Sequence, residues 1–584
     1  LQSTRKNTTA RCSFPFTAFS EMTTNKRCCQ NHHDADVTPI LVIGSGPHAL
    51  AFVTKFLEPS SDPFEETPWN STLFTSNTSE SHYKYRFSRQ YLRGERGRVI
   101  RQKVRNAERQ EFAPEQYFRI VDTDGEWLRQ WQSQFDRLGI QYLRSGDNAH
   151  VDPVSWETMR MGIYEKHCAW IQDEPPASRE PRYVPRIYGR HCKCTTTKKH
   201  DSEDQSNNDN ELPACRELQF VPRNDSYHGP FSAPSSRHFV QFCDKIVERY
   251  NLQSMVEEAS AQSISVEEEQ NVNMSNEKRT IYKVTLSTGR TIRALHIVLA
   301  LGPQRVRKCP APLVGYLAED QEVHSTSRSR LPIVHSLDLL RPNSQDEWIK
   351  LLHCLEKKNV PAARVLVIGG GLTSSHLVLR LHQHFSCGTT EKKKVQLTLI
   401  SRGQLQVQPF DLKMSWMGRT RRHKLALFWS EQDYERRAML VKDAKNRASI
   451  TPEVFHQLQQ LQNQQVLVLR ENMELTNAEY LEQEHQWQVQ FQESSNASSP
   501  HLRGPENNDD DVNGSNNSLY DYIICATGTS TSLTNEPLLS SFCSQMEFTS
   551  STNQAKLTPD LRIADGQNVY VLGDAAALQL GPDA

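Results

Sequence analysis

Two glycine-rich turns, each between a short aliphatic run and an amphipathic run, dominate the hydrophobic pattern of the chain. The first lies in PILVIGSGPHALAFVTKFL, residues 39–57, and the second in RVLVIGGGLTSSHLVLRL, residues 364–381. An aliphatic run bounded by glycine is typical of a parallel strand that is buried on both faces. Each segment therefore predicts a strand, a tight turn and a helix.

The spacing within the first turn points to a dinucleotide. Gly44, Gly46 and Ala49 form the pattern G-x-G-x-x-A. Gly44 permits the tight turn, Gly46 lets a pyrophosphate approach the backbone, and Ala49 lets helix and strand pack closely. The N-terminus of the helix then faces the phosphates.

A dinucleotide site also needs an acidic residue at the end of its second strand, where it holds the ribose hydroxyls. No suitable residue follows about twenty to thirty positions after the turn. The best candidate is Asp122, at the end of the β-favouring run QYFRIVD. The alternative is that Asp122 is only a turn residue before Asp124 and Gly125.

The second turn carries Gly369, Gly371 and Ser374 in the corresponding positions. The strand that follows, KVQLTLISRG, ends in Arg402. An arginine at the place where an NAD site has an acid suits the 2′-phosphate of NADP. Arg402 therefore predicts NADP, with an ordinary surface arginine as the alternative.

Two later strands also end in small or acidic residues. The strand predicted in LYDYIICATGTS, residues 519–530, ends in Ala526, Thr527 and Gly528. The strand predicted in NVYVLGDAAALQLGP, residues 568–582, ends in Gly573 and Asp574. A strand that closes in Gly-Asp suits a flavin, because the aspartate can bind the ribityl chain. We expect Gly44 and Gly573 to lie close together, since both must reach one flavin.

Composition favours folded domains diluted by polar insertions. The chain has 584 residues, and its hydrophobic fraction of 36% is low for that length. At roughly 150 residues per domain, two or three domains are expected. The segments with too few apolar residues to build a core are 1–36, 58–116, 172–215, 265–280 and 491–518. Residues 1–36 are predicted to be a disordered tail or a targeting segment.

Charge and cysteine content disfavour several kinds of partner. The 68 Lys and Arg residues balance 69 Asp and Glu residues, so no basic field argues for nucleic acid. No apolar run reaches the ~18 residues that a membrane span needs. The 13 cysteines are scattered, which fits a reducing compartment. The run HCKCTTTKKH, residues 191–200, favours a solvated loop over a metal site, and no metal is predicted.

On these motifs the chain resembles the two-dinucleotide flavoproteins, specifically the flavin-containing monooxygenases and the lysine/ornithine N-hydroxylase group. Further similar stretches are VDTDGEWLRQWQSQFDRLGIQYLRS, PSSRHFVQFCDKIVERYNL and LISRGQLQVQPFD. The resemblance covers roughly residues 37–584 apart from the insertions. It implies FAD in the N-terminal site and NADPH in the inserted second site. The cofactor-binding residues predicted in this way are Gly44, Gly46, Pro47, His48, Ala49, Asp122, Trp127, Gly369, Gly371, Ser374, Arg402, Thr527, Gly528, Gly573 and Asp574.

The predicted fold is α/β, with two Rossmann-like, doubly wound dinucleotide-binding domains and the NADP domain inserted into the FAD domain. The FAD domain is assigned to 37–330 and 520–584, and the NADP domain to 331–519. Members of the family continue into a helix that covers the flavin, so the C-terminal part is predicted to be incomplete. The pattern F-x-G-x-x-x-H is missing. Only His335 remains of it, in IVHSLDLL, which argues against the flavin-containing and Baeyer–Villiger subfamilies.

The function implied by the resemblance is an NADPH-dependent FAD monooxygenase. Reduced flavin would take up O₂ as a hydroperoxide and hydroxylate an amine or a similar small nucleophile. The flavin carries this chemistry, so no catalytic side chain is predicted. A flavin oxidoreductase with another acceptor and a non-catalytic FAD/NADP-binding regulatory protein remain open. The oligomeric state is not predicted. The expected location is cytoplasmic, or the mitochondrion or plastid if residues 1–36 are a transit segment.

Overall fold

The computed structural model describes most of the chain between the predicted insertions. The described residues are 37–57, 113–145, 151–152, 186–187, 231–232, 234–270, 278–302, 307–318, 331–341, 345–357, 362–386, 394–417, 421–445, 448–494, 517–530, 532–534 and 536–582. The tail 1–36, the run HCKCTTTKKH, and most of 58–116, 172–215 and 491–518 lie outside them.

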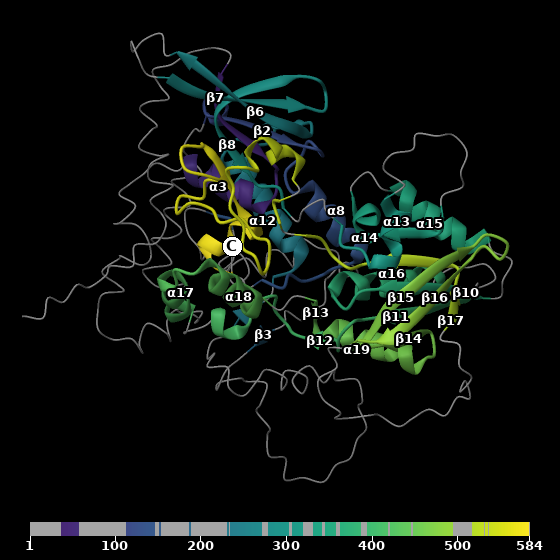
Figure 1. Ribbon diagram of the computed structural model, residues 1–584. Coiled ribbons are helices and arrows are strands. Elements are labelled where there is room, and N and C mark those ends of the chain that lie inside the picture. The colour runs from purple at the N-terminus through teal and green to yellow at the C-terminus, as the bar shows by residue number, and fades with distance from the viewer. Residues whose placement is uncertain are drawn as a thin grey trace, which may run out of the picture.

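The first glycine turn belongs to a sheet that combines the N-terminal half of the chain with one late strand (Figure 1). Its strands are β1 (Val37–Ile43), β2 (Phe118–Asp122), β5 (Val256–Glu258), β6 (Ala261–Gln270), β7 (Lys278–Leu286), β8 (Thr291–Leu299) and β19 (Val569–Val571). The order is β5-β2-β1-β8-β7-β6, with β19 beside β8. β5, β2, β1, β8 and β19 run parallel, whereas β6 and β7 are antiparallel. We call this sheet and its covering elements the first unit.

Alternation along β1 fills a core on each face of this sheet. Ile40 and Val42 pack in one cluster with the helices α3 (Pro47–Leu57) and α12 (Ser236–Arg249). Leu41 and Ile43 point to the other face, where the C-terminal part of the chain covers them. Because neighbouring side chains of a strand point to opposite faces, an all-apolar run is what such a two-sided strand requires.

The second glycine turn belongs to a five-stranded parallel sheet of order β14-β11-β10-β18-β9. These strands are β9 (Ile333–His335), β10 (Ala362–Ile368), β11 (Lys394–Ile400), β14 (Leu467–Arg470) and β18 (Tyr522–Cys525). Its faces also hold separate cores. One contains residues of α14 (Ser336–Leu340), α15 (Gln345–Lys357), α16 (Leu372–Ser386) and α19 (Pro452–Asn463). The other is covered by the antiparallel strands β15 (Met473–Leu481), β16 (Gln486–Glu493) and β17 (Asn517–Tyr520). We call this the second unit.

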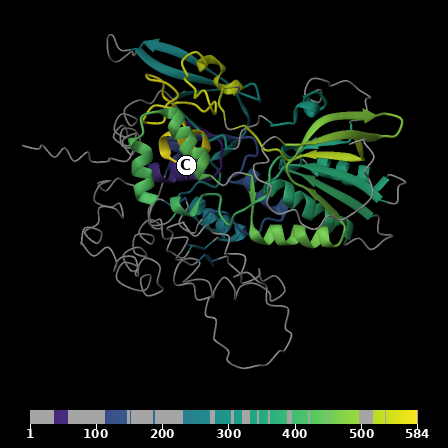
Figure 2. The same cartoon turned by 60° about the horizontal axis from the view of Figure 1, so that its bottom comes forward.

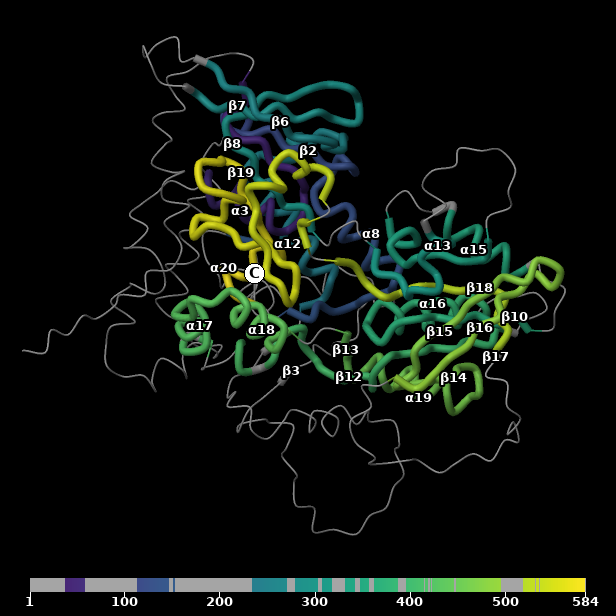
Figure 3. Tube along the Cα trace, viewed as in Figure 1, coloured from purple at the N-terminus to yellow at the C-terminus, as the bar shows by residue number. Residues whose placement is uncertain are grey.

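One excursion of the second unit reaches over to the first. The chain leaves after β12 (Gln406–Val407) and returns at β13 (Ser449–Ile450), and these two short strands pair in parallel (Figure 3). Between them, α17 (Arg421–Ser430) and α18 (Tyr434–Ala444) pack on the C-terminal α20 (Ala577–Leu580). Figures 1 and 2 both show α17 and α18 beside the C-terminus, away from the rest of the second unit. We call residues 408–448 the excursion.

The remaining short elements are η1 (Pro114–Gln116), α8 (Arg129–Leu138), β3 (Arg186–Ile187), β4 (Phe231–Ser232), η5 (Ala311–Leu313), α13 (Val314–Ala318), η7 (Met414–Trp416), η8 (Pro537–Phe542) and η9 (Gly573–Ala576). In the described part of the chain, no helix is both long and apolar enough to cross a membrane.

The predicted α/β fold with two parallel-strand sheets is confirmed, but two boundaries differ. Much of segment 265–280 forms strands β6 and β7, because ladder hydrogen bonds stabilise a hairpin whose outer strand carries few apolar residues. The predicted boundary at 519/520 also moves. β17 and β18 pair within the second unit, so this unit extends at least to Cys525. The domain assignment is otherwise still a prediction.

Candidate nucleotide-binding sites

The first turn needs glycine at its first position for a steric reason. Gly44 has φ +106°, and a Cβ there would lie 2.3 Å from the Ala300 carbonyl oxygen. The backbone is held from both sides. The Gly44 N–H donates to Val121 O (2.9 Å), and the Ala300 N–H donates to Ile43 O (2.8 Å). By contrast, no heavy atom lies within 4 Å of a Cβ built on Gly46. The backbone therefore leaves no space for a side chain at Gly44, whereas the space beside Gly46 is open.

Asp122 comes to this turn, as the sequence predicted. It ends β2, whose Val121 is level with Ile43 of β1. Its Oδ2 accepts the Ser45 N–H (2.9 Å), and its Oδ1 accepts the Asp124 N–H (2.9 Å). The carboxylate is thus oriented by two backbone donors at the edge of the turn.

The second turn repeats this geometry closely. Gly369 has φ +148°, and a Cβ there would lie 2.3 Å from Ala526 O. The Gly369 N–H donates to Ile400 O (2.9 Å), and the Ala526 N–H donates to Ile368 O (2.8 Å). The two strand–turn–helix segments therefore meet their sheets in the same way.

Two further small residues complete the second turn. Gly370 is not among the predicted residues, yet a Cβ on it would meet Ser401 Oγ at 2.2 Å. The run of three glycines was the signal that could have identified it. Ser374, which was selected, is buried, and its hydroxyl donates to Gly371 O (2.7 Å). The helix α16 thus begins tightly against the turn.

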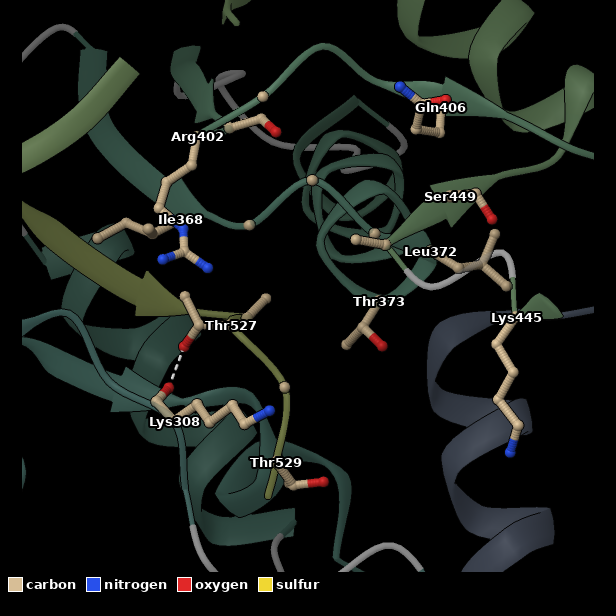
Figure 4. A pocket seen from close by; sticks show the side chains of 18 of the residues that line it. Lys308, Ile368, Leu372, Thr373, Arg402, Gln406, Lys445, Ser449, Thr527 and Thr529 are labelled. Carbon is tan, nitrogen blue, oxygen red and sulfur yellow. Dashed lines mark hydrogen bonds between the residues drawn. The ribbon is translucent and has the colours of Figure 1, made fainter. Parts of the chain in front are cut away.

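A cavity of about 1540 Å³ opens in front of the second turn (Figure 4). It exceeds the ~300–1,000 Å³ of an ordinary small-ligand pocket and is large enough for a dinucleotide. Of the predicted residues, its lining includes Gly369, Gly371, Arg402, Thr527 and Gly528. These come from three strands of one sheet, so the cavity lies at the carboxyl edge, where ligands bind in open α/β sheets.

Most of the charged residues that line the cavity are basic. It contains five basic residues, Arg144, Lys308, Arg402, Arg421 and Lys445, against two acidic ones, Asp411 and Glu474. Such a lining favours an anionic ligand. Arg402 and Lys308 lie on one side of the cavity and Lys445 on the opposite side (Figure 4). The basic residues other than Arg402 were missed. Lys308, Arg421 and Lys445 come from segments that carry no motif, and nothing in the family-like stretch that contains Arg144 singles this residue out.

Arg144 joins the first unit to the excursion. Its guanidinium donates to Phe410 O (2.8 Å), Ser449 O (3.0 Å) and Ser449 Oγ (2.6 Å). Burial lowers the pKa of Arg144, and the nearby Asp411 opposes this effect. Asp411 is open to the cavity but surrounded by protein on most sides. The resulting loss of hydration raises its pKa, while Arg144 and Lys445 work in the opposite direction.

The C-terminal Gly-Asp turn lies next to the first glycine turn, as expected. A Cβ on Gly573 would lie 3.4 Å from His48 Nδ1. Asp574 forms an ion pair with Lys445, across the contact between the units. His48 faces both charges. Loss of hydration within this group lowers its pKa, with Asp574 opposing and Lys445 adding to the shift.

Two other residues considered in the sequence have contacts within the protein core. The Trp127 indole is buried, and its N–H donates to Leu252 O (2.9 Å). His335 is fully buried at the end of β9, and its Nδ1 accepts the Leu337 N–H (3.2 Å) at the start of α14. Burial lowers the pKa of His335 to about 4. Within the described residues, no three His, Cys, Asp or Glu side chains could hold a metal.

Two glycine turns, each at the end of a strand with parallel neighbours, define a protein with two dinucleotide-binding units. The family L-lysine 6-monooxygenase/L-ornithine 5-monooxygenase matches residues 237–530, which is 294 of 584 residues. The chain therefore belongs to this family of oxidoreductases, and the predicted resemblance is confirmed. Comparison with curated proteins gives no match.

Comparison with solved structures gives similar proteins at low sequence identity. A cadaverine monooxygenase of desferrioxamine biosynthesis from Erwinia amylovora, bound to FAD, is 12% identical with TM-score 0.50, over 93% of this chain and 90% of that one. An ornithine hydroxylase from Pseudomonas aeruginosa is 12% identical with TM-score 0.49, over 94% of both chains. An ornithine N-hydroxylase from Kutzneria, with reduced FAD, NADP⁺ and L-ornithine, is 12% identical with TM-score 0.48, over 93% and 94%.

Proposed function

We propose that the chain is an NADPH-dependent FAD monooxygenase that hydroxylates the amine of a small molecule through a flavin hydroperoxide. One observation carries the proposal. A single chain builds two glycine turns of matching geometry, each with a backbone oxygen 2.3 Å from the place of a Cβ, on two sheets whose first strands end there. Two such turns are what two dinucleotides acting together require.

The first turn fits FAD. The open backbone at Gly46 leaves space for a pyrophosphate, and the N-terminus of α3 follows it directly. Asp122 is held at the turn by Ser45, where it would accept hydrogen bonds from a ribose. Asp574 lies beside the same turn and would accept them from the ribityl chain.

The second turn fits NADPH. The cavity in front of it holds Arg402, whose guanidinium would pair with the 2′-phosphate as a charge-assisted contact. Lys308 and Thr527 line the same cavity, and the Thr527 hydroxyl donates to the carbonyl of Lys308. We assign FAD to the first turn because Asp574, which would bind the ribityl chain, lies beside that turn. NADPH is therefore assigned to the second turn.

An amine substrate is supported by the family to which the chain belongs, since both amino acids in its description carry a side-chain amine. When bound, the flavin supplies the redox and oxygen chemistry, and the protein binds, orients and excludes water. We assign no catalytic side chain. Arg144 contributes by holding the excursion against the first unit, which keeps the two sites in a fixed relation.

An absorbance experiment on the full chain tests this function. The purified protein is reconstituted with FAD and mixed with NADPH, first without oxygen and then with it. We expect bleaching of the flavin by NADPH, then a transient oxygenated-flavin absorbance with O₂. Ornithine, lysine and cadaverine are then compared for the ratio of hydroxylated product to hydrogen peroxide, with a tertiary amine as the control.

Two other outcomes would each replace the proposal. If reduced flavin is reoxidised only by an added quinone or dye, the protein is an oxidoreductase with a different acceptor. If the full chain binds FAD and NADPH but NADPH never bleaches the flavin, the nucleotide sites serve regulation.

A further inference from the structure

One ion pair connects the two proposed cofactor sites. Lys445 follows α18 at the end of the excursion, and its ammonium pairs with the carboxylate of Asp574 in η9. The pair is partly shielded from solvent, since 15% of the Lys445 side chain and 35% of the Asp574 side chain are exposed. An ion pair in such surroundings is screened less than one at the surface.

Each partner of this pair belongs to a different site. Lys445 lines the cavity of the second turn, on the side opposite Arg402 (Figure 4). Asp574 lies beside the first turn, because a Cβ built on Gly573, the residue before it, would lie 3.4 Å from His48 Nδ1. The same two charges therefore face two different ligands.

We propose that the Lys445–Asp574 ion pair couples the two sites, so that a dinucleotide bound at either turn favours binding at the other. The inference rests on the proposed cofactors. Ribityl hydroxyls at the first turn would compete with Lys445 for Asp574. Phosphate oxygens in the second cavity would compete with Asp574 for Lys445. Either ligand must separate the pair, and the second ligand then finds its partner already released.

The expected size of the effect follows from site-to-site coupling in general. The first ligand supplies the free energy that separates the ion pair. The second ligand no longer needs to supply it and binds more tightly, which is positive cooperativity. Coupling of this kind changes affinity by about 5- to 150-fold. By linkage, FAD must tighten NADP⁺ binding by the same factor as NADP⁺ tightens FAD binding.

Binding titrations of the full-length chain, stripped of cofactor, measure the coupling without turnover. FAD is titrated by flavin fluorescence with and without saturating NADP⁺, and NADP⁺ by calorimetry with and without FAD. In the unaltered protein the FAD dissociation constant should fall at least 5-fold when NADP⁺ is present. In Lys445→Met, FAD should bind equally well with and without NADP⁺.

Two variants keep the test specific. Lys413→Met removes another ion-paired lysine of the excursion, whose partner is Asp443 and which does not line the cavity. This variant should keep the full coupling. Lys445→Arg retains the charge and should keep the coupling too, so it answers the question if Lys445→Met fails to fold.

The outcomes separate the two proposals. If both nucleotides bind the unaltered protein but independently, the coupling is refuted and the proposed cofactors stand. If Lys445→Met retains the coupling, or Lys445→Arg loses it, the ion pair is not its source. If the unaltered chain binds neither nucleotide, the proposed function and the inference both fail.

Discussion

We propose that the choice between the two nicotinamide cofactors depends on Arg402. Its side chain is exposed at the end of β11 and lines the cavity. Among the described residues, its guanidinium has no hydrogen-bond or ion-pair partner. A cation in that position is available to an incoming phosphate and contributes little to stability while it stays solvated.

Replacing Arg402 with Ala should remove most of the preference for NADPH over NADH. Loss of a charge-assisted contact to the 2′-phosphate corresponds to about 1–3 kcal/mol. The ratio of the two dissociation constants, measured by calorimetry, checks this. Arg290→Ala is the control, because Arg290 is an exposed arginine that pairs with Glu257 outside the cavity. An unchanged ratio in Arg402→Ala would mean that the phosphate binds elsewhere.

His335 predicts a dependence of stability on pH. Burial lowers its pKa from 6.5 to about 4 in the folded protein. Between these values the unfolded chain takes up a proton that the folded chain refuses, so stability falls as pH drops from about 6.5 to about 4. The loss from this one group by pH 5 is about 2 kcal/mol.

His335→Asn should make the protein less sensitive to acid. Asparagine can still cap α14 but does not titrate. The difference between the unfolding free energies at pH 7 and pH 5, from urea titrations, should shrink by about 2 kcal/mol relative to the unaltered protein. The exposed His423→Asn is the control. An identical difference in His335→Asn and the unaltered protein would contradict the assignment.

The two glycine turns are built on the same steric requirement. In each, the first glycine has a positive φ and faces a carbonyl oxygen of the neighbouring strand. The backbone cannot move away, because ladder hydrogen bonds hold the strand on each side. The turn and its sheet therefore act as one rigid piece, which is what presents the helix N-terminus to a ligand.

Gly369→Ala should disrupt the second turn. The added Cβ would meet Ala526 O at 2.3 Å, and φ +148° is strained for alanine. We expect a loss of about 2–4 kcal/mol in stability, together with loss of NADP⁺ binding. Thermal unfolding and calorimetry measure the two effects. Gly403→Ala is the matched control for stability, since nothing lies within 4 Å of its Cβ position, and its thermal unfolding should be nearly unchanged.

Two sets of contacts hold the two units together. Arg144 of the first unit donates hydrogen bonds to Phe410 O in the excursion and to Ser449 O in β13. The excursion in turn reaches the C-terminal segment, where the buried Arg437 donates to Leu578 O (3.2 Å) and the Trp429 indole N–H to Gln579 O (3.0 Å). Because each unit supplies part of the other's surroundings, we expect them to unfold together.

Arg144→Met should weaken this cooperativity. It removes the hydrogen bonds that the guanidinium donates to the carbonyls of Phe410 and Ser449 in a partly buried contact, and hydrogen bonds to a charged group contribute about 1.5–3 kcal/mol each. Urea unfolding followed by tryptophan fluorescence should change from one transition to two. Arg436→Met, which removes an exposed arginine of the excursion, should leave a single transition. A single transition in Arg144→Met would show that other contacts dominate.

The α/β class, both glycine turns and the place of Asp122 could be predicted from the sequence alone. Periodicity and glycine spacing are local signals, and they result from steric limits that act within a few residues. Asp122 was found across a long insertion, because the strand before it also has a local signature. The nearness of Gly573 to the first turn followed from the requirement that both reach one cofactor.

The basic cavity, the Arg144 contacts and the Lys445–Asp574 pair could not be predicted in this way. Each depends on residues that are hundreds of positions apart or that carry no motif. The same holds for β6, where hydrogen bonds to β7 stabilise a strand too polar to identify as sheet. The local sequence determines which conformation a segment prefers. These features depend instead on which distant segments come into contact when the two units pack.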